Sequence, residues 1–149
     1  MEKLSNVLTG VSGEYFVAAE LSRRGYIASL TSRNTKGVDI LASNQDASKS
    51  VGIQVKTKDA NKKSWLLGQK AENYTGKLLF YVFVNLKDKD ERPDFHIVPS
   101  ERVSHYVWES HKKWLKTLGK KGQPHQDNLM RTFEDKDNQY QERWELLGL

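Results

Sequence analysis

Residues 37–58 read GVDILASNQDASKSVGIQVKTK. Two apolar runs, residues 38–42 and 51–58, flank a polar stretch at 44–50. The second run alternates apolar and polar side chains, which is the period of a strand whose two faces meet different surroundings. The stretch therefore predicts two neighbouring strands joined by a polar turn.

The segments around this stretch predict helices and further strands. Apolar residues recur at helical spacing within residues 4–24, and Gly25 follows as a stop signal, so we expect a helix there. Residues 78–86 (LLFYVFVNL) are apolar on both faces, as in a central strand. Further strands are expected at 26–31, 65–67 and 94–98, a short helix at 68–74, and a helix from 100 to about 118 with Ser100 as its N-cap.

This order of elements predicts a mixed α/β fold. A helix, three strands, a short helix, two strands and a helix would form a central mixed sheet of about five strands flanked by helices. The length of 149 residues suits one domain over 1–149. Residues 119–149 are expected to form a C-terminal extension that packs on the core. The stretch Pro124–Asp127, with Arg131 beyond it, could cap a functional site or brace this tail, and we expect it to brace the tail.

Composition limits the cellular setting. The chain has no cysteine, which excludes disulfides and thiolate metal sites. No apolar run approaches the roughly 20 residues of a membrane span, and no secretory signal is visible, so we expect a cytoplasmic protein that does not associate with membranes. The net charge of +5 permits a polyanionic partner, although lysine-rich solubility explains it equally well.

Four polar residues stand out within the predicted elements. Because side chains alternate along a strand, Gln54 and Lys56 should share one face. Asp39 interrupts a short apolar strand, where an unpaired carboxylate is costly to bury, and Glu14 falls inside the apolar stripe of the first helix. Each also has an ordinary explanation: one face of the strand could meet water, Asp39 could be solvated at the strand end, and Glu14 could bend out to solvent.

Taken in chain order, the helical Glu14, the Gly-x-Asp ending at Asp39 and the Gln54-x-Lys56 resemble the PD-(D/E)xK nuclease superfamily. The closest pattern is that of its Holliday-junction resolvase-like and Mrr-like members. The resemblance covers roughly residues 8–85, and the later segments LLFYVFVNL and DFHIVPS look like a group of small bacterial proteins of the same superfamily. Two positions depart from the commonest pattern, because Val38 stands in place of Pro and Gln54 in place of Glu.

The resemblance implies a restriction-endonuclease-like core and Mg²⁺-dependent hydrolysis of phosphodiester bonds in nucleic acid, DNA in preference to RNA, with Mn²⁺ as a substitute ion. Catalytic roles fall to Glu14, Asp39, Gln54 and Lys56. The metal ligands would be Asp39, Gln54, the Val55 backbone carbonyl and Glu14, and the nucleic-acid contacts would be Arg33, Lys36 and Lys58. Related nucleases often act as dimers, so a homodimer could form.

Two other functions remain open. Gln54 lowers the number of carboxylates from three to two, so the fold could serve as a nucleic-acid-binding module with weak or no catalysis. The chain could also be an interaction partner of another protein. Outside the motif, Trp65, Trp108 and Trp114 could stack on bases, although we expect Trp108 and Trp114 to be buried. A run of lysines from Lys112 to Lys121 could contact phosphates or be a solvated helix end.

Overall fold

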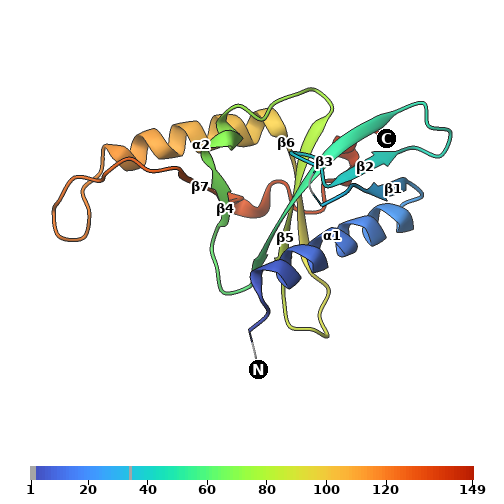
Figure 1. Ribbon diagram of the computed structural model, residues 1–149, viewed down its shortest axis with the longest axis horizontal. Coiled ribbons are helices and arrows are strands. Elements are labelled where there is room, and N and C mark those ends of the chain that lie inside the picture. Colours follow the sequence, from blue (N-terminus) through green and yellow to red (C-terminus); the bar gives the residue numbers. More distant parts are fainter. Residues whose placement is uncertain (1–2, 34) are drawn as a thin grey trace.

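The computed structural model describes residues 3–33 and 35–149 and confirms the mixed α/β class (Figure 1). Its main sheet has five strands in the order β1-β2-β3-β5-β6, and a separate two-stranded ribbon joins β4 to β7. The elements are α1 (Asn6–Arg23), β1 (Ile27–Leu30), β2 (Ile40–Ser43), β3 (Ser50–Asp59), β4 (Trp65–Gly68), η1 (Gln69–Glu72), β5 (Leu79–Leu86), β6 (Asp94–Pro99), α2 (Ser100–Leu115), β7 (Met130–Phe133), η2 (Lys136–Asn138) and η3 (Trp144–Leu147).

The strands of the main sheet differ in direction. β1, β2 and β3 follow one another in antiparallel pairs, whereas β5 runs parallel to β3 and antiparallel to β6. A parallel pair needs a crossover, and the chain from β4 through η1 provides it. As predicted, residues 78–86 contain an interior strand, because β5 is paired on both edges and most of its side chains are buried.

Alternation along the strands produces two apolar layers. Ile53 and Val55 of β3 face α1 and pack with Val17 and Leu21, and η3 adds Trp144 to this layer. On the opposite face, aromatic side chains of β5 pack against β4, β7 and α2 in a second cluster: Trp65, Tyr81, Phe83, Val103, Val107 and Phe133. Both clusters contain residues that lie far apart in the sequence, which explains why the tail stays close to the sheet.

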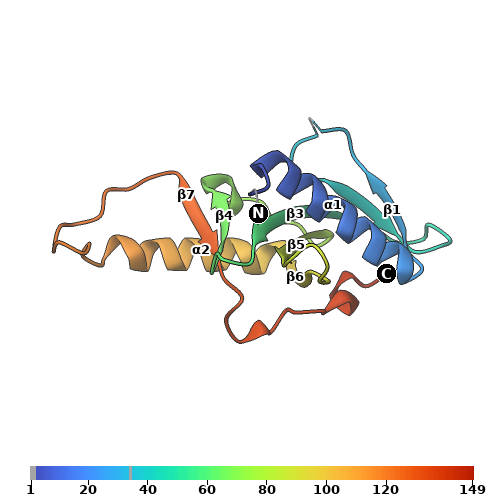
Figure 2. The ribbon, with the colours of Figure 1, turned by 90° about the horizontal axis from the view of Figure 1, so that it is seen from below.

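The chain after α2 returns to the body of the molecule (Figure 2). β7 pairs with β4, and beyond it the amide of Glu142 donates to the carbonyl of Phe95 over 2.8 Å. Trp144 and Leu147 then complete the α1 layer of the core. Within the described residues, no helix has the length and apolar character that crossing a membrane requires.

Three sequence predictions about local structure are wrong. Ser100 is the first residue of α2 rather than its N-cap, because its hydroxyl binds the backbone of Gly76, accepting from the amide and donating to the carbonyl, each over 3.1 Å. Trp65 is buried and donates its indole N–H to the carbonyl of Val84 over 2.8 Å, so it cannot stack on bases. Trp108 is not in the core, since 46% of it is exposed.

Candidate active site

Asp39 lies where β2 and β3 separate. The last residue pair of their ladder joins Ile40 to Ile53. Just beyond it, the amide of Asp39 donates to the carbonyl of Ile53 over 2.8 Å, and the amide of Val55 donates to the Asp39 carboxylate Oδ2 over 2.7 Å. The ladder with β2 ends before Val55, so the Asp39 carboxylate takes the place of a backbone acceptor for the Val55 amide. This hydrogen bond fixes the carboxylate in the gap between the strands.

The two faces of the sheet beside this gap carry different polar residues. Gln54 and Lys56 are half-buried on the face opposite α1, whereas Glu14 belongs to α1 itself. The positive charge of Lys56 acts on Asp39, and the negative charge of Asp39 acts on Glu14. Asp39 is therefore close enough to Glu14 and to Lys56 for their charges to interact with its own, and Gln54 stands on β3 between Ile53 and Val55, the two residues that bind Asp39.

Both acids are held in surroundings that disfavour their charged forms. Burial raises the pKa of Asp39 above its usual range, and the Val55 hydrogen bond and the Lys56 charge oppose this shift. The pKa of Glu14 is raised first by burial and second by repulsion from Asp39, with Arg33 acting in the opposite direction. Negative charge at this site is thus only partly balanced by the protein's own cations, which is the condition under which a bound metal ion stabilises both carboxylates.

Gly13 sets how closely α1 approaches this site. A Cβ at Gly13 would lie 1.8 Å from the hydroxyl oxygen of Thr57. Thr57 follows Lys56 on β3, and its hydroxyl is buried without a hydrogen-bond partner among the described residues. Because Glu14 follows Gly13, the absence of a side chain at Gly13 allows α1 to bring the carboxylate of Glu14 near the sheet.

Tyr74 also belongs to the site, although the sequence analysis did not identify it. Its hydroxyl donates to the carbonyl of Gly37, and its pKa is raised by burial and then by the charge of Asp39. Gly37 has a φ of +79°, and a Cβ there would lie 2.9 Å from the Tyr74 ring. The Gly-x-Asp spacing was a partial signal, because this glycine allows Tyr74 to hold the backbone two residues before Asp39.

The predicted phosphate contacts occupy different surroundings. Arg33 is exposed and close enough to influence Glu14, and Lys36 is exposed in the segment that leads to Asp39. Lys58 is buried, with its ammonium group donating to the carbonyl of Lys62 over 2.6 Å and to the side chain of Asn85 over 2.9 Å. These bonds fix Lys58 away from solvent, so we remove it from the expected nucleic-acid contacts.

The donors around Asp39 are hard oxygen ligands. Within residues 3–33 and 35–149, no group of three or more His, Cys, Asp or Glu side chains could hold a metal ion. The candidate site instead offers two carboxylates, the Gln54 amide oxygen and the Val55 carbonyl, which lies on the side of β3 where β2 has ended. Such a set fits Mg²⁺ or Mn²⁺, with weaker binding than three carboxylates would give.

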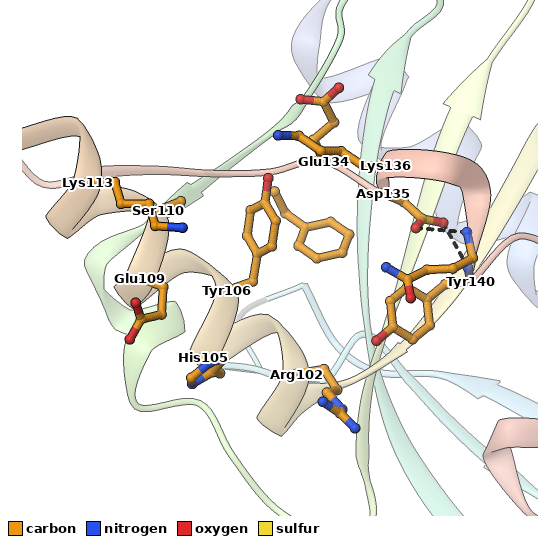
Figure 3. Close-up of a pocket in the computed structure, with 12 residues that line it drawn as sticks. Arg102, His105, Tyr106, Glu109, Ser110, Lys113, Glu134, Asp135, Lys136 and Tyr140 are labelled. Carbon is orange, nitrogen blue, oxygen red and sulfur yellow. Dashed lines mark hydrogen bonds between the residues drawn. The ribbon is translucent and has the colours of Figure 1, made fainter. Parts of the chain in front are cut away.

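Two cavities lie apart from this cluster. One of about 530 Å³ lies between α2 and the chain after β7, where Tyr106 points towards Glu134 (Figure 3). Beside it, the buried Asp135 carboxylate lies 2.7 Å from His96 Nδ1 and accepts from two backbone amides. The other, of about 770 Å³, adjoins the start of α1 and the loop after β3. Of the described residues that line either cavity, none is a predicted catalytic residue.

Comparisons with models of protein families, with curated proteins and with solved structures found no match to this chain. Membership of the PD-(D/E)xK superfamily therefore stays a prediction. The chemistry of the Asp39 site has to be inferred from its own donors and charges.

Proposed function

We propose that this chain is a metal-dependent phosphodiesterase that acts on nucleic acid, DNA in preference to RNA. The observation that supports the proposal is the Asp39 carboxylate held by the Val55 amide in the gap between β2 and β3, close enough to Glu14 and Lys56 for their charges to interact with its own. Acidic oxygen donors beside a lysine are the parts that hydrolysis of a phosphodiester requires.

Each residue of the cluster would have a separate role. Asp39, the Gln54 amide oxygen, the Val55 carbonyl and Glu14 would hold Mg²⁺. When bound, this ion supplies Lewis-acid polarisation of the phosphate and a lowered pKa for a coordinated water. Lys56 would orient the attacking water and stabilise the negative charge that develops on the phosphate oxygens.

Residues outside the metal shell would position the substrate and the segment before β2. Arg33 and Lys36 are exposed near Asp39 and would contact neighbouring phosphates. Tyr74 is a positioning residue, because its hydroxyl holds the Gly37 carbonyl and thereby the approach of the chain to Asp39.

Metal binding can be tested without any turnover. Thermal unfolding of the wild-type protein should shift upward as Mg²⁺ or Mn²⁺ is added, because a ligand that binds only the folded state stabilises it. Asp39→Asn should abolish the shift, whereas Asp46→Asn, at an exposed acid in the turn after β2, should leave it unchanged. Equal shifts in all three proteins would contradict the site.

Cleavage should then be measured with Mg²⁺ or Mn²⁺ on supercoiled, single-stranded and branched DNA, and on RNA. Lys56→Ala and Asp39→Ala should each abolish activity, and the control Lys70→Ala, at an exposed lysine of η1, should not. Activity that survives both site substitutions would refute the proposal.

Gln54 favours one second candidate, a nucleic-acid-binding module of the same fold. Restoring a carboxylate with Gln54→Glu separates the two functions. An enzyme weakened by the amide should cleave faster after this change. A binding module should show salt-dependent affinity without a metal requirement and no cleavage in either form.

A further inference from the structure

The positive charge of this protein is concentrated in one short segment. Residues 112–126 contain five lysines and no acidic residue. The whole chain has 24 basic and 19 acidic residues, so removing these five leaves 19 of each sign elsewhere. The segment, which we call the lysine arm, therefore accounts for the entire formal net charge of +5. Its lysines are Lys112, Lys113, Lys116, Lys120 and Lys121.

The lysine arm projects from the body of the molecule. It comprises the last turn of α2 and the loop that follows, drawn in orange, and both views place it at one end of the long axis (Figures 1 and 2). The turn that joins β2 to β3 lies near the opposite end in both views. All five lysines are exposed.

Contacts within the arm and at its two ends give it a defined shape. The ring of Trp114 stacks on His125 with centroids 4.1 Å apart, and His111 Nε2 lies 2.7 Å from the Asp127 carboxylate. At the tip, the amide of Gly119 donates to the carbonyl of Gln123 over 2.7 Å. These contacts attach residues 125 and 127 to α2, and they do so without using a lysine side chain.

The arm's charge is not balanced by the protein. Every ion pair found among the described residues uses other basic side chains. Lys112 and Lys116 are one helical turn apart, a spacing at which like charges repel. Beside them, the exposed ring of Trp108 lies under the ammonium group of Lys112 at 3.9 Å. An ordered cluster of like charges beside an exposed aromatic ring is the pattern of a surface that meets a polyanion with bases.

We propose that the lysine arm binds the phosphate backbone of a nucleic acid, as a contact separate from the Asp39 site. This inference depends on the proposed function in one respect, which is that the polyanion is a nucleic acid. Repeated phosphates match five lysines on one projecting segment, and binding releases the counterions that the cluster would otherwise hold. Because the remaining chain is formally neutral, the arm supplies the main electrostatic attraction and the Asp39 site supplies the chemistry.

The test measures affinity for duplex and single-stranded DNA by fluorescence anisotropy, with EDTA present so that no cleavage occurs. The arm variant changes all five lysines to Gln. A matched variant changes five exposed lysines elsewhere to Gln and has the same net charge: Lys49, Lys63, Lys70, Lys77 and Lys89. The arm variant should lose at least about tenfold in affinity at low salt, and the slope of log affinity against log salt should fall by up to about 4 on duplex DNA. The matched variant should stay close to wild type.

Further controls separate this proposal from its rivals. A variant with Arg at the five positions should keep its affinity, and both Gln variants should unfold at the wild-type temperature. Equal losses in the arm and matched variants would overturn the proposal, as would loss of binding to polyglutamate or anionic vesicles with DNA binding unchanged. The outcome does not depend on catalysis. If only the arm variant loses affinity for DNA and the wild type never cleaves it, the arm is supported while the enzymatic function fails.

Discussion

The close approach of α1 to β3 can be tested by Gly13→Ala. The new Cβ would lie 1.8 Å from the Oγ1 of Thr57, 2.9 Å from its Cβ and 3.0 Å from its Cγ2, whereas ordinary contact begins at 3.4 Å. A rotation of the Thr57 side chain could move the oxygen, but it cannot move Cβ. The helix must therefore retreat by at least about 0.5 Å, the difference between 3.4 and 2.9 Å, and by about 1.6 Å if the side chain stays in place.

Two opposing terms set the size of the effect. Overpacking a close-packed interface costs about 1–3 kcal/mol. Replacing a glycine inside a helix by alanine stabilises the helix by about 1 kcal/mol. We therefore expect Gly13→Ala to lower the free energy of unfolding by up to about 2 kcal/mol. The retreat of α1 should also carry Glu14 away from Asp39, so that the stabilisation of this variant by Mg²⁺ becomes smaller than that of the wild type.

Urea unfolding followed by circular dichroism measures this effect, and the helix offers its own control. Gly10 lies one turn earlier in α1, and a Cβ there would have no neighbour within 4 Å. Gly10→Ala should therefore be more stable than the wild type by up to about 1 kcal/mol. Combining Gly13→Ala with Thr57→Ala should recover part of the loss. If Gly13→Ala proves as stable as Gly10→Ala, the close approach of α1 to β3 is not what the structure indicates.

Three further changes probe buried polar groups. Thr57→Val removes a buried hydroxyl that has no partner among the described residues and should raise the free energy of unfolding by about 1 kcal/mol, with a decrease counting against the assignment. Asp135→Ala leaves His96 and two backbone amides without their acceptor and should cost about 2–4 kcal/mol in urea unfolding; a cost below about 1 kcal/mol would show that water replaces the carboxylate. Asp39→Asn keeps an acceptor for the Val55 amide but removes a carboxyl group whose pKa is raised by burial. Without metal, the wild type should therefore lose stability relative to the variant as the pH rises above about 4 and through the folded-state pKa of Asp39. Unfolding free energies from pH 4 to 8 check the sign, and a variant that becomes relatively less stable with rising pH would contradict it.

Local pattern predicted the elements but not what covers them. Alternation within residues 51–58 correctly separated the faces of β3, because side-chain direction follows from strand geometry alone. The same pattern could not show that Trp65 and Asn85 would enclose Lys58, since those residues come from other strands. The burial of Lys58 depends on these contacts between strands, which the pattern of neighbouring residues in the sequence does not contain.

The errors at α2 have a similar cause. Ser100 has the residue type and sequence position of an N-cap. Its hydroxyl instead accepts a hydrogen bond from the amide of Gly76 and donates one to the carbonyl of Gly76, which lies in the crossover between β3 and β5. The apolar spacing of α2 continues past Val107, but Val107 is the last buried residue of that helix and Trp108 beside it is 46% exposed. Periodicity shows which face of a helix is apolar, and only the tertiary fold determines how far along the helix that face is covered.

The Asp39 site depends on several features that do not favour stability by themselves. Burial opposes ionisation of Glu14 and Asp39, the Thr57 hydroxyl lacks a partner among the described residues, and Gly37 adopts a positive φ. Glu14 and Thr57 lie where α1 meets β3, and Asp39 and Gly37 lie at or just before the gap between β2 and β3. Natural proteins keep such local costs mainly where function requires them. A variant library scored for stability should therefore find stabilising substitutions concentrated around this gap, and the same substitutions should weaken Mg²⁺ binding. If the stabilising changes were spread evenly over the surface, the gap would be an ordinary defect of packing rather than a site.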